Sequence, residues 1–332
     1  MHRKRSLLLS VGFAAALLGL ALAPVSASYP GKHNGRIAFG IRAADGSSNI
    51  YTVRADGKGQ KQLTHGPGKH ICPAYSPDGR TIAYCADTSG AFEIWTMRHD
   101  GKNQRQLTHL GGFVFFPDFS PDGSKVAFAG WVGDDPNSQI YAVNATTGGG
   151  LQQLTSCAGV APGCLNDTPV WSPDGTKIAF LHAETDEEGN PFDMQVWLMD
   201  ADGNNPHALT SDGLWKDQVP DWSPDGSKIA YNAGDFGSGG IWVIDADGGH
   251  QHQLTGCVAS DPAPCASGDD FGVAWSPDGK KIAFLRDLSA VGGTDRHVWV
   301  MKADGSHERQ LTTGAGVRAV PAWQAKPRGH GH

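Results

Sequence analysis

The sequence predicts an all-β fold, a six-bladed β-propeller of four-stranded blades, and three observations carry that prediction. First, the 332-residue chain contains 45 Gly and 20 Pro, too many helix breakers for a helical bundle or coiled coil. Second, ten Trp, thirteen Phe and six Tyr supply enough apolar surface to exclude a disordered chain. Third, a seven-residue motif ending in Ser-Pro-Asp-Gly occurs five times, which indicates a fold built from repeats.

The recurring phrase predicts the first turn of each repeat. It reads PAYSPDG at 73–79, PDFSPDG at 117–123, PVWSPDG at 169–175, PDWSPDG at 220–226 and VAWSPDG at 273–279. Pro presets φ, Asp caps its own backbone and Gly accepts a positive φ, so these residues favour a tight turn. A polar or basic pair and a strand of the type Ile-Ala-Phe follow, as at 177–180.

Two further strands complete each repeat. A third, apolar strand recurs at 50–53, 94–97, 140–143, 196–199, 241–244 and 298–301. An Ala-Asp-Gly-like turn then leads to a short strand ending in Leu-Thr, whose leucines are Leu63, Leu107, Leu154, Leu209, Leu254 and Leu311. These leucines are 44, 47, 55, 45 and 57 residues apart, which gives six units. One four-stranded sheet cannot bury its own faces, whereas six sheets arranged radially bury one another.

The two ends of the repeat region predict how the ring closes. Residues 35–39 form a second strand with no first strand before them, and residues 321–324 form a first strand with no Ser-Pro-Asp-Gly after them. We therefore expect one C-terminal strand to pair with three N-terminal strands in a single blade. The propeller then spans 35–324, with a short segment at 28–34 and a flexible tail at 325–332.

The N-terminus has the pattern of a secretory signal peptide over residues 1–27. A basic segment with Arg3, Lys4 and Arg5 precedes an apolar run at 7–23 and a small-x-small site at 25–27. That run is near the lower limit of a membrane span, so an uncleaved anchor is the alternative. We expect cleavage, a periplasmic or secreted protein, and no transmembrane span in the mature chain.

The charge of the chain bears on its partners. Removing residues 1–27 deletes three of the 27 basic residues and none of the 34 acidic ones, so the formal charge changes from −7 to 24 − 34 = −10. An acidic chain lacks the basic surface on which nucleic-acid binding depends, so we expect no nucleic-acid partner. We expect a monomer whose partner is an envelope or extracellular protein.

Six cysteines in an exported chain predict disulfides. The expected pairs are local: Cys72 with Cys85, Cys157 with Cys164, and Cys257 with Cys265. The last two pairs each follow a Leu-Thr dipeptide, so we expect a disulfide within the same loop of two repeats. A cysteine metal site is the alternative, but no spacing is of the Cys-x-x-Cys type.

The full repeat resembles that of the TolB-like β-propeller family. It reads Pro-x-Trp-Ser-Pro-Asp-Gly-x-Lys-Ile-Ala-Phe, then Ile-Trp-Val-Met-x-Ala-Asp-Gly, then Gln-Leu-Thr. The resemblance implies a periplasmic or secreted propeller that binds envelope proteins, as TolB binds the lipoprotein Pal. Similar repeats form the gating propellers of prolyl-oligopeptidase-like peptidases and a metal-dependent oligogalacturonate lyase. TolB has an additional N-terminal α/β domain, for which only a few residues before the first strand are available here.

The strand order places the loops on two faces. The Ser-Pro-Asp-Gly and Ala-Asp-Gly turns lie on one, the turn face, and the longer, irregular loops lie on the other, the loop face, where binding is expected. Five residues before each first-strand aromatic, the chain should reach the mouth of the central channel. Those positions hold His70, Val114, Asn166, Asp217, Asp270 and Arg318, with Asp167 beside Asn166. Such a ring is a candidate site for a polar ligand or a divalent cation; the alternative, which we favour, is that these side chains cap loop backbone groups.

Aromatic residues on the loop face are a second candidate site. They are Phe113, Phe115, Phe116, Trp131 and Trp215. They form either a patch for a partner or packing between blades.

The sequence contains none of the common catalytic signatures. There is no Gly-x-Ser-x-Gly and no His-Glu-x-x-His, and the Asp-x-Asp-Gly segments lack the glutamate of a calcium loop. We therefore expect a protein-binding or scaffolding module without a cofactor. The alternative is a propeller enzyme, a carbohydrate lyase or hydrolase, whose metal requires several converging histidines; His70 is at the mouth, with His65 and His109 nearby.

Overall fold

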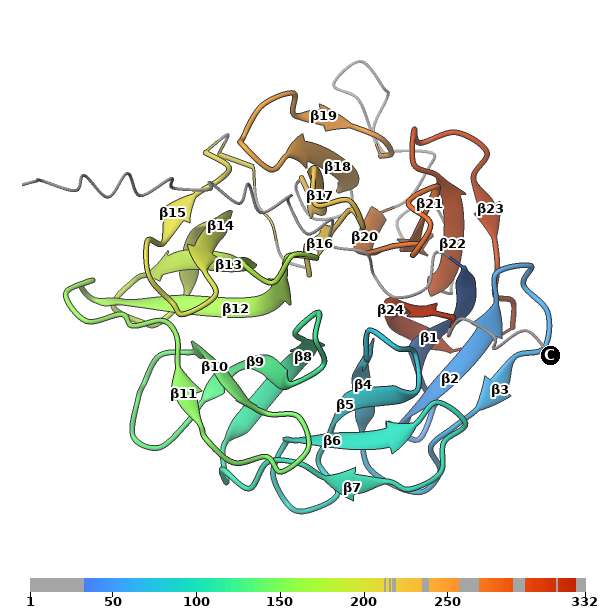
Figure 1. The fold of residues 1–332 in the computed structure, drawn as a ribbon, viewed down its shortest axis with the longest axis horizontal. Coiled ribbons are helices and arrows are strands. Elements are labelled where there is room, and N and C mark those ends of the chain that lie inside the picture. Colours follow the sequence, from blue (N-terminus) through green and yellow to red (C-terminus); the bar gives the residue numbers. More distant parts are fainter. Residues whose placement is uncertain are drawn as a thin grey trace, which may run out of the picture.

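A computed structural model describes residues 33–211, 213–214, 216, 219–234, 239–256, 269–288, 296–314 and 316–326. Six four-stranded antiparallel sheets are arranged around a centre, as Figure 1 shows. The described residues contain no helix. The predicted six-bladed β-propeller is confirmed.

The blades are numbered in chain order, and the first strand of each blade is the innermost. Blade 1 contains β24 (Val317–Ala325), β1 (Asn34–Arg42), β2 (Ser48–Arg54) and β3 (Lys61–Gln62). Blade 2 contains β4 (His70–Tyr75), β5 (Thr81–Ala86), β6 (Glu93–Arg98) and β7 (Arg105–Gln106). Blade 3 contains β8 (Phe113–Phe119), β9 (Lys125–Trp131), β10 (Gln139–Asn144) and β11 (Gln152–Gln153).

Blade 4 contains β12 (Gly163–Trp171), β13 (Lys177–Thr185), β14 (Pro191–Asp200) and β15 (His207–Ala208). Blade 5 contains β16 (Asp221–Trp222), β17 (Lys228–Ala233), β18 (Gly240–Asp245) and β19 (His252–Gln253). Blade 6 contains β20 (Asp269–Trp275), β21 (Lys281–Asp287), β22 (Arg296–Lys302) and β23 (Arg309–Gln310).

Blade 1 closes the ring in the predicted way. The C-terminal strand β24 pairs antiparallel with β1, with Trp323 opposite Ile37 and Ala322 opposite Ala38. The two chain ends are thereby held in one sheet, because the blade needs hydrogen bonds from both.

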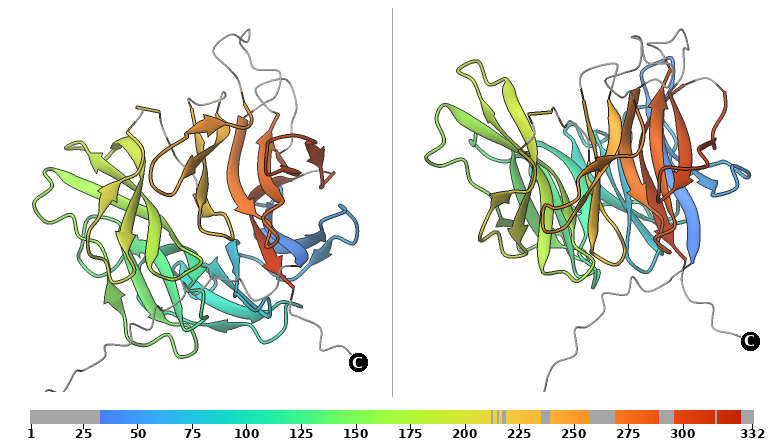
Figure 2. Two further views of the ribbon diagram at one scale, coloured as in Figure 1. Left: turned by 45° about the horizontal axis from the view of Figure 1, so that its top comes forward. Right: turned by 90° about the horizontal axis from the view of Figure 1, so that it is seen from above.

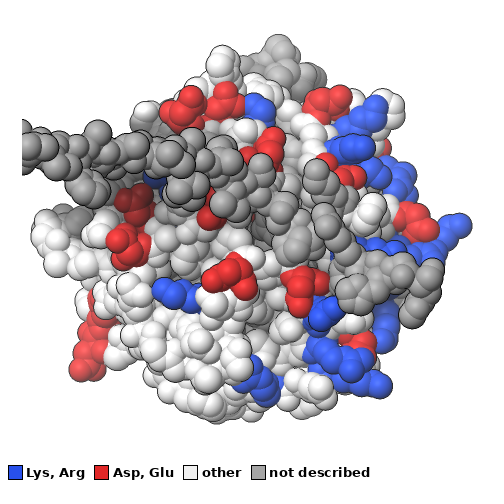
Figure 3. All heavy atoms as spheres, viewed as in Figure 1, with Lys and Arg blue, Asp and Glu red and all other residues white. Residues whose placement is uncertain are grey.

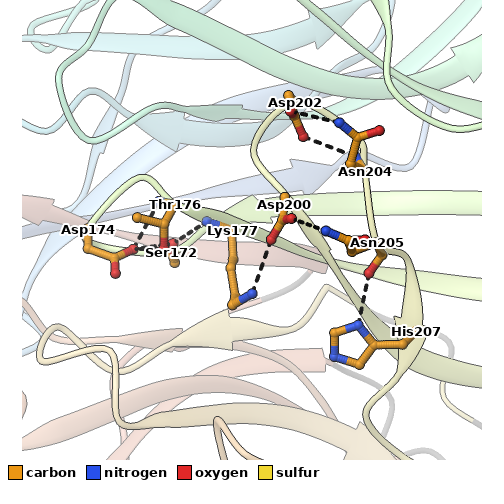
Figure 4. A network of polar contacts seen from close by, with 9 residues as sticks. All are labelled: Ser172, Asp174, Thr176, Lys177, Asp200, Asp202, Asn204, Asn205 and His207. Atoms are coloured by element: carbon orange, nitrogen blue, oxygen red, sulfur yellow. Dashed lines mark hydrogen bonds and ion pairs between the residues drawn. The ribbon is translucent and has the colours of Figure 1, made fainter.

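Side-chain hydrogen bonds explain why Ser-Pro-Asp-Gly recurs. In blade 4, Ser172 Oγ donates to Asp174 Oδ1 at 2.6 Å, and Ser172 Oγ accepts from the backbone N–H of Lys177 at 2.9 Å (Figure 4). Gly175 closes the turn at a φ of +71°. On the neighbouring turn, Asp200 accepts from Lys177 Nζ at 3.2 Å, which ties the two turns together (Figure 4).

Leu-Thr has an equally local role. In all six blades the threonine Oγ1 accepts a hydrogen bond from the first apolar N–H of the third strand, at 2.8–3.1 Å: Thr64 from Ile50, Thr108 from Ile94, Thr155 from Ile140, Thr210 from Val196, Thr255 from Ile241 and Thr312 from Val298. The leucine before it is buried or half-buried between blades. The dipeptide therefore fixes the short outer strand onto its blade.

The core lies between blades rather than within them. Ile178 and Phe180 of blade 4 pack on Ala127, Ala129 and Ile140 of blade 3. Each fully buried side chain of this kind contributes about 1.5–3 kcal/mol. The small alanines let neighbouring sheets approach closely.

A β-bulge bends the first strand in four blades. The bulge residues Cys72, Phe116, Thr168 and Gly272 all have a φ between 51° and 58°, and the strand registers shift at these points. One extra residue reverses which side of the sheet the preceding side chains occupy.

Candidate functional site

Three of the predicted channel-mouth residues, His70, Asn166 and Asp270, are buried. The Nδ1 atom of His70 lies 3.2 Å from the carbonyl of Ser48 in blade 1. Asp270 accepts two hydrogen bonds from Arg286, at 2.6 and 2.7 Å. His70 and Asn166 contact the preceding blade, and Asn166 does so through Gln139 at 3.0 Å.

The other predicted residues differ in placement. Asp167 is half-buried, and burial raises its pKa to about 7, although the N–H of Thr168 donates to it at 2.8 Å. Val114 is fully buried. Asp217 and the side chain of Arg318 lie outside the described part of the structure. The described members therefore do not form an exposed ring, and their role in ligand binding stays a prediction.

A groove with a volume of about 1040 Å³ lies between blades 3 and 4. We call it the interblade groove. One wall is the loop of Ser156 and Val160, and the other is formed by β13 and β14. These two strands have 9 and 10 residues, whereas β9 and β10 of blade 3 have 7 and 6. The β13–β14 hairpin therefore extends past its neighbour, as Figure 2 shows.

A chain of contacts connects the disulfide to the groove. Cys157 and Cys164 are bonded, which rigidifies the wall. Asn166 Nδ2 donates to Cys164 Sγ at 3.3 Å, and Asn166 Oδ1 lies 2.8 Å from His182 Nδ1. The His182 ring lies 4.3 Å from the Trp197 ring, centroid to centroid. Because an amide oxygen accepts, this contact places the His182 proton on Nδ1 and leaves Nε2 as an acceptor.

The electrostatics of the groove are acidic. Glu184 and Asp193 line it and are exposed. Burial lowers the pKa of His182, which Glu184 partly opposes, so the imidazole is neutral near pH 7. Among the described residues lining the groove there is no Lys or Arg. Lys and Arg gather instead along the rim over β2, β3 and β23 (Figure 3), which includes Lys61 and Arg309.

Sequence reasoning did not find the groove, although a signal for it exists. In five blades a glutamine precedes Leu-Thr and lies opposite the third-strand aromatic, as Gln106 does for Trp95. In blade 4 this position is Ala208, opposite Trp197. Ala208 and the half-exposed Trp197 both line the groove.

An aromatic patch lies on blades 2 and 3 and is centred on Phe113 and Trp131, which are 59% and 37% exposed. The two residues are direct cross-strand partners. Phe92 packs on Phe115 and Phe113, with ring centroids 4.7 and 6.4 Å apart, and Phe115 packs on Phe116 at 6.3 Å. Both sequence interpretations hold in part, since Phe115 and Phe116 fill space between blades while Phe113 and Trp131 face solvent. Trp215 lies outside the described residues.

The central channel contains a second cavity, of about 110 Å³. Its described lining is largely apolar, and the two carboxyl groups in it belong to Asp118 and Asp221. Each accepts the backbone N–H of a tryptophan in the next blade, Trp171 at 2.8 Å and Trp275 at 2.5 Å. Burial raises the pKa of Asp118 to about 7 and that of Asp221 to about 8.

The cysteine predictions have three outcomes. The Cys157–Cys164 disulfide is present. Cys72 and Cys85 are buried free thiols, so the prediction of a bond between them is wrong in this structure. The bulge at Cys72 puts Ile71, not Cys72, in register with Cys85. Cys257 and Cys265 lie outside the described residues.

Two further features are absent from the described residues. No group of three or more His, Cys, Asp or Glu side chains is placed to hold a metal ion. No helix long and apolar enough to cross a membrane occurs there either.

The fold and its loop face define a closed TolB-type propeller. The family model of the TolB beta propeller domain matches residues 103–273, which is more than half of the chain. The chain belongs to the TolB-like β-propeller family.

Individual relatives agree with this assignment. The uncharacterized protein Atu1656 of Agrobacterium fabrum is 35% identical over 197 residues, 58% of this chain and 48% of that protein. The chain thus spans about half the length of this curated relative. TolB from Acinetobacter baumannii has a similar structure, with a TM-score of 0.67 and 22% identity over 87% of this chain and 66% of that one. The putative TolB from Agrobacterium tumefaciens has a TM-score of 0.63 and 22% identity over 87% and 91%. Identities this low show a shared fold.

Proposed function

We propose that this protein is an exported binding module that holds a partner protein on the loop face of its propeller. The observation that carries the proposal is the aromatic patch, because Phe113 and Trp131 expose large apolar surfaces side by side. Clustered exposed aromatics are typical of protein interfaces and costly to leave in water. The signal-peptide pattern at 1–27 supports export, and membership of the TolB-like family supports a partner in the cell envelope or outside the cell.

The chemistry of the patch indicates the kind of surface that it binds. Lys69 Nζ lies 5.8 Å from the Phe92 ring centroid and is the cation in contact with the patch. An apolar partner surface with an acidic edge complements this arrangement. The rigid scaffold holds these side chains in place, so binding costs little conformational entropy.

A pull-down from envelope and culture-medium extracts tests the proposal. The baits are the mature protein, the variant Phe113→Ser with Trp131→Ser, and a control, Leu151→Ser, which removes an apolar side chain that is 44% exposed. We expect a protein that the first and third baits enrich at least tenfold over the second. Equal capture by all three baits means that the partner binds elsewhere than at the patch. If no bait enriches any protein, the binding function is rejected, and the enzyme alternative takes precedence and calls for a glycan and metal screen.

A further inference from the structure

We propose that the interblade groove binds an arginine or lysine side chain that a partner presents on an extended polypeptide segment. The proposal rests on the proposed protein-binding function and adds a second contact site with its own chemistry. Three observations carry it: a matching site inside blade 6, the charge of the groove, and its shape.

Blade 6 shows what this position between blades accommodates. The Arg286 guanidinium carbon lies 4.8 Å from the Trp299 ring and 5.3 Å from the Phe284 ring. The same guanidinium is paired with the carboxylates of Asp270 and Glu308, each at 2.6 Å. A buried guanidinium on aromatic rings with two carboxylates is thus stable in this fold.

Blade 4 keeps the aromatic part of that site and leaves the rest open. Phe180 and Trp197 are cross-strand partners, as Phe284 and Trp299 are. His182 stands where Arg286 stands, because each pairs with the equivalent residue of the first strand. By the same register, the position of Glu308 is held by Pro206, which lines the groove. Blade 6 supplies Arg286 as its own cation, whereas the described residues that line the groove include no Lys or Arg.

The carboxylates of the groove replace those of blade 6. Thr210 Oγ1 donates to Gln195 Oε1 at 2.7 Å, and Gln195 Nε2 donates to Asp193 Oδ1 at 2.6 Å. This relay fixes the Asp193 carboxylate before any ligand arrives. Glu184 stands on the adjacent strand β13, where its backbone pairs with Cys164 and Phe192 and its carboxylate is exposed in the groove. The neutral His182 between them does not repel a cation.

The shape of the groove favours a polypeptide segment over a single small cation. Its volume of about 1040 Å³ is at the upper end of the range for pockets that hold drug-sized ligands, which leaves far more room than a single small cation needs. Phe192 lines the groove and is 46% exposed, so it offers an apolar contact beside the carboxylates. A cationic residue flanked by apolar residues fits this arrangement. A neutral glycan can stack on the aromatic rings, but the two carboxylate charges add no ion-pair energy to its binding.

Calorimetric titration of the mature protein tests the proposal. The probe is an amidated, acetylated pentapeptide of alternating leucine and arginine, and its control carries citrulline, a neutral isostere, in place of arginine. We expect the arginine peptide to bind at least tenfold more tightly, and its affinity to fall severalfold when salt is raised from about 50 to about 500 mM. No binding, or equal binding of the two peptides, overturns the proposal, as does a neutral oligosaccharide that binds instead.

Two variants locate the site. Glu184→Gln with Asp193→Asn should lower the affinity for the arginine peptide at least tenfold. Asp247→Asn with Asp304→Asn, which removes the same charge from turns of blades 5 and 6 that do not line the groove, should leave the affinity unchanged. Equal affinity of the two double variants overturns the location. His182→Arg gives the groove a cation of its own and should abolish binding; its melting temperature shows that it is folded. The Phe113→Ser, Trp131→Ser protein should bind the peptide normally, so a failed groove and a failed patch give different results.

Discussion

The two carboxyl groups in the central channel should make the stability of the propeller depend on pH in an unusual direction. Asp221 is held in a largely apolar cavity, and burial raises its pKa from 3.8 to about 8. The unfolded chain releases this proton near pH 4, whereas the folded protein keeps it up to about pH 8. The folded state therefore binds more protons across this window. The contribution of Asp221 to stability is largest below pH 4 and declines as the pH rises to about 8.

The size of the effect follows from the pKa shift. Each pKa unit corresponds to about 1.4 kcal/mol, so a shift from 3.8 to about 8 sets an upper limit of about 6 kcal/mol. The carboxyl group faces the channel and keeps part of its hydration, which reduces the expected loss to about 2–3 kcal/mol. Asp221→Asn removes the charge and keeps an oxygen for the N–H of Trp275. The variant should therefore be more stable than the parent by about 2–3 kcal/mol at pH 9 and nearly equal to it at pH 4.

Urea unfolding at pH 4, 6, 8 and 9 measures this difference. The control is Asp122→Asn, because hydrogen bonds from Ser120 and Ser124 hold the pKa of Asp122 below its usual value. That variant should be less stable than the parent at pH 6 and above, so its effect has the opposite sign. The reasoning is refuted if Asp221→Asn shows the same pH slope as the parent, or if it is the less stable protein at pH 9.

Three further predictions concern cysteines and the buried ion pair. Cys157→Ser removes the disulfide and should lower the free energy of unfolding by about 2 kcal/mol. It should also lower the affinity of the groove for the arginine peptide. An unchanged urea midpoint and an unchanged affinity contradict this prediction. Cys72 and Cys85 should be unreactive to a thiol reagent in the folded protein. After denaturation without reductant both should be labelled, as peptide mapping shows, whereas no label at either position means that they are bonded. Arg286→Met leaves the carboxylate of Asp270 buried without its partner and should cost about 3–5 kcal/mol in urea unfolding; adding Asp270→Leu should recover part of that loss, and no recovery argues against the ion pair as the cause.

The candidate sites were only partly predictable from the sequence. Phe113 and Trp131 were predicted to lie on the loop face, and their exposure separates them from the neighbouring Phe115 and Phe116. His182 was not singled out, because a histidine in an apolar strand has no pattern of its own. Its place in the groove depends on contacts with Asn166 and Trp197, which lie on the two neighbouring strands.

The sequence by itself determined the number of blades, their order and the closure of the ring. Those features depend on turns and short strands within one blade, in which Ser172 contacts Lys177 five residues away and Thr210 contacts Val196 fourteen residues away. Only the tertiary structure decided which side chains meet between blades. A one-residue bulge at Cys72 or Thr168 reverses the side of the strand and leaves no distinctive sequence pattern. Asn166 and Asp270, two residues before the bulges at Thr168 and Gly272, are buried, and the longer strands of blade 4 extend past those of blade 3 beside the groove.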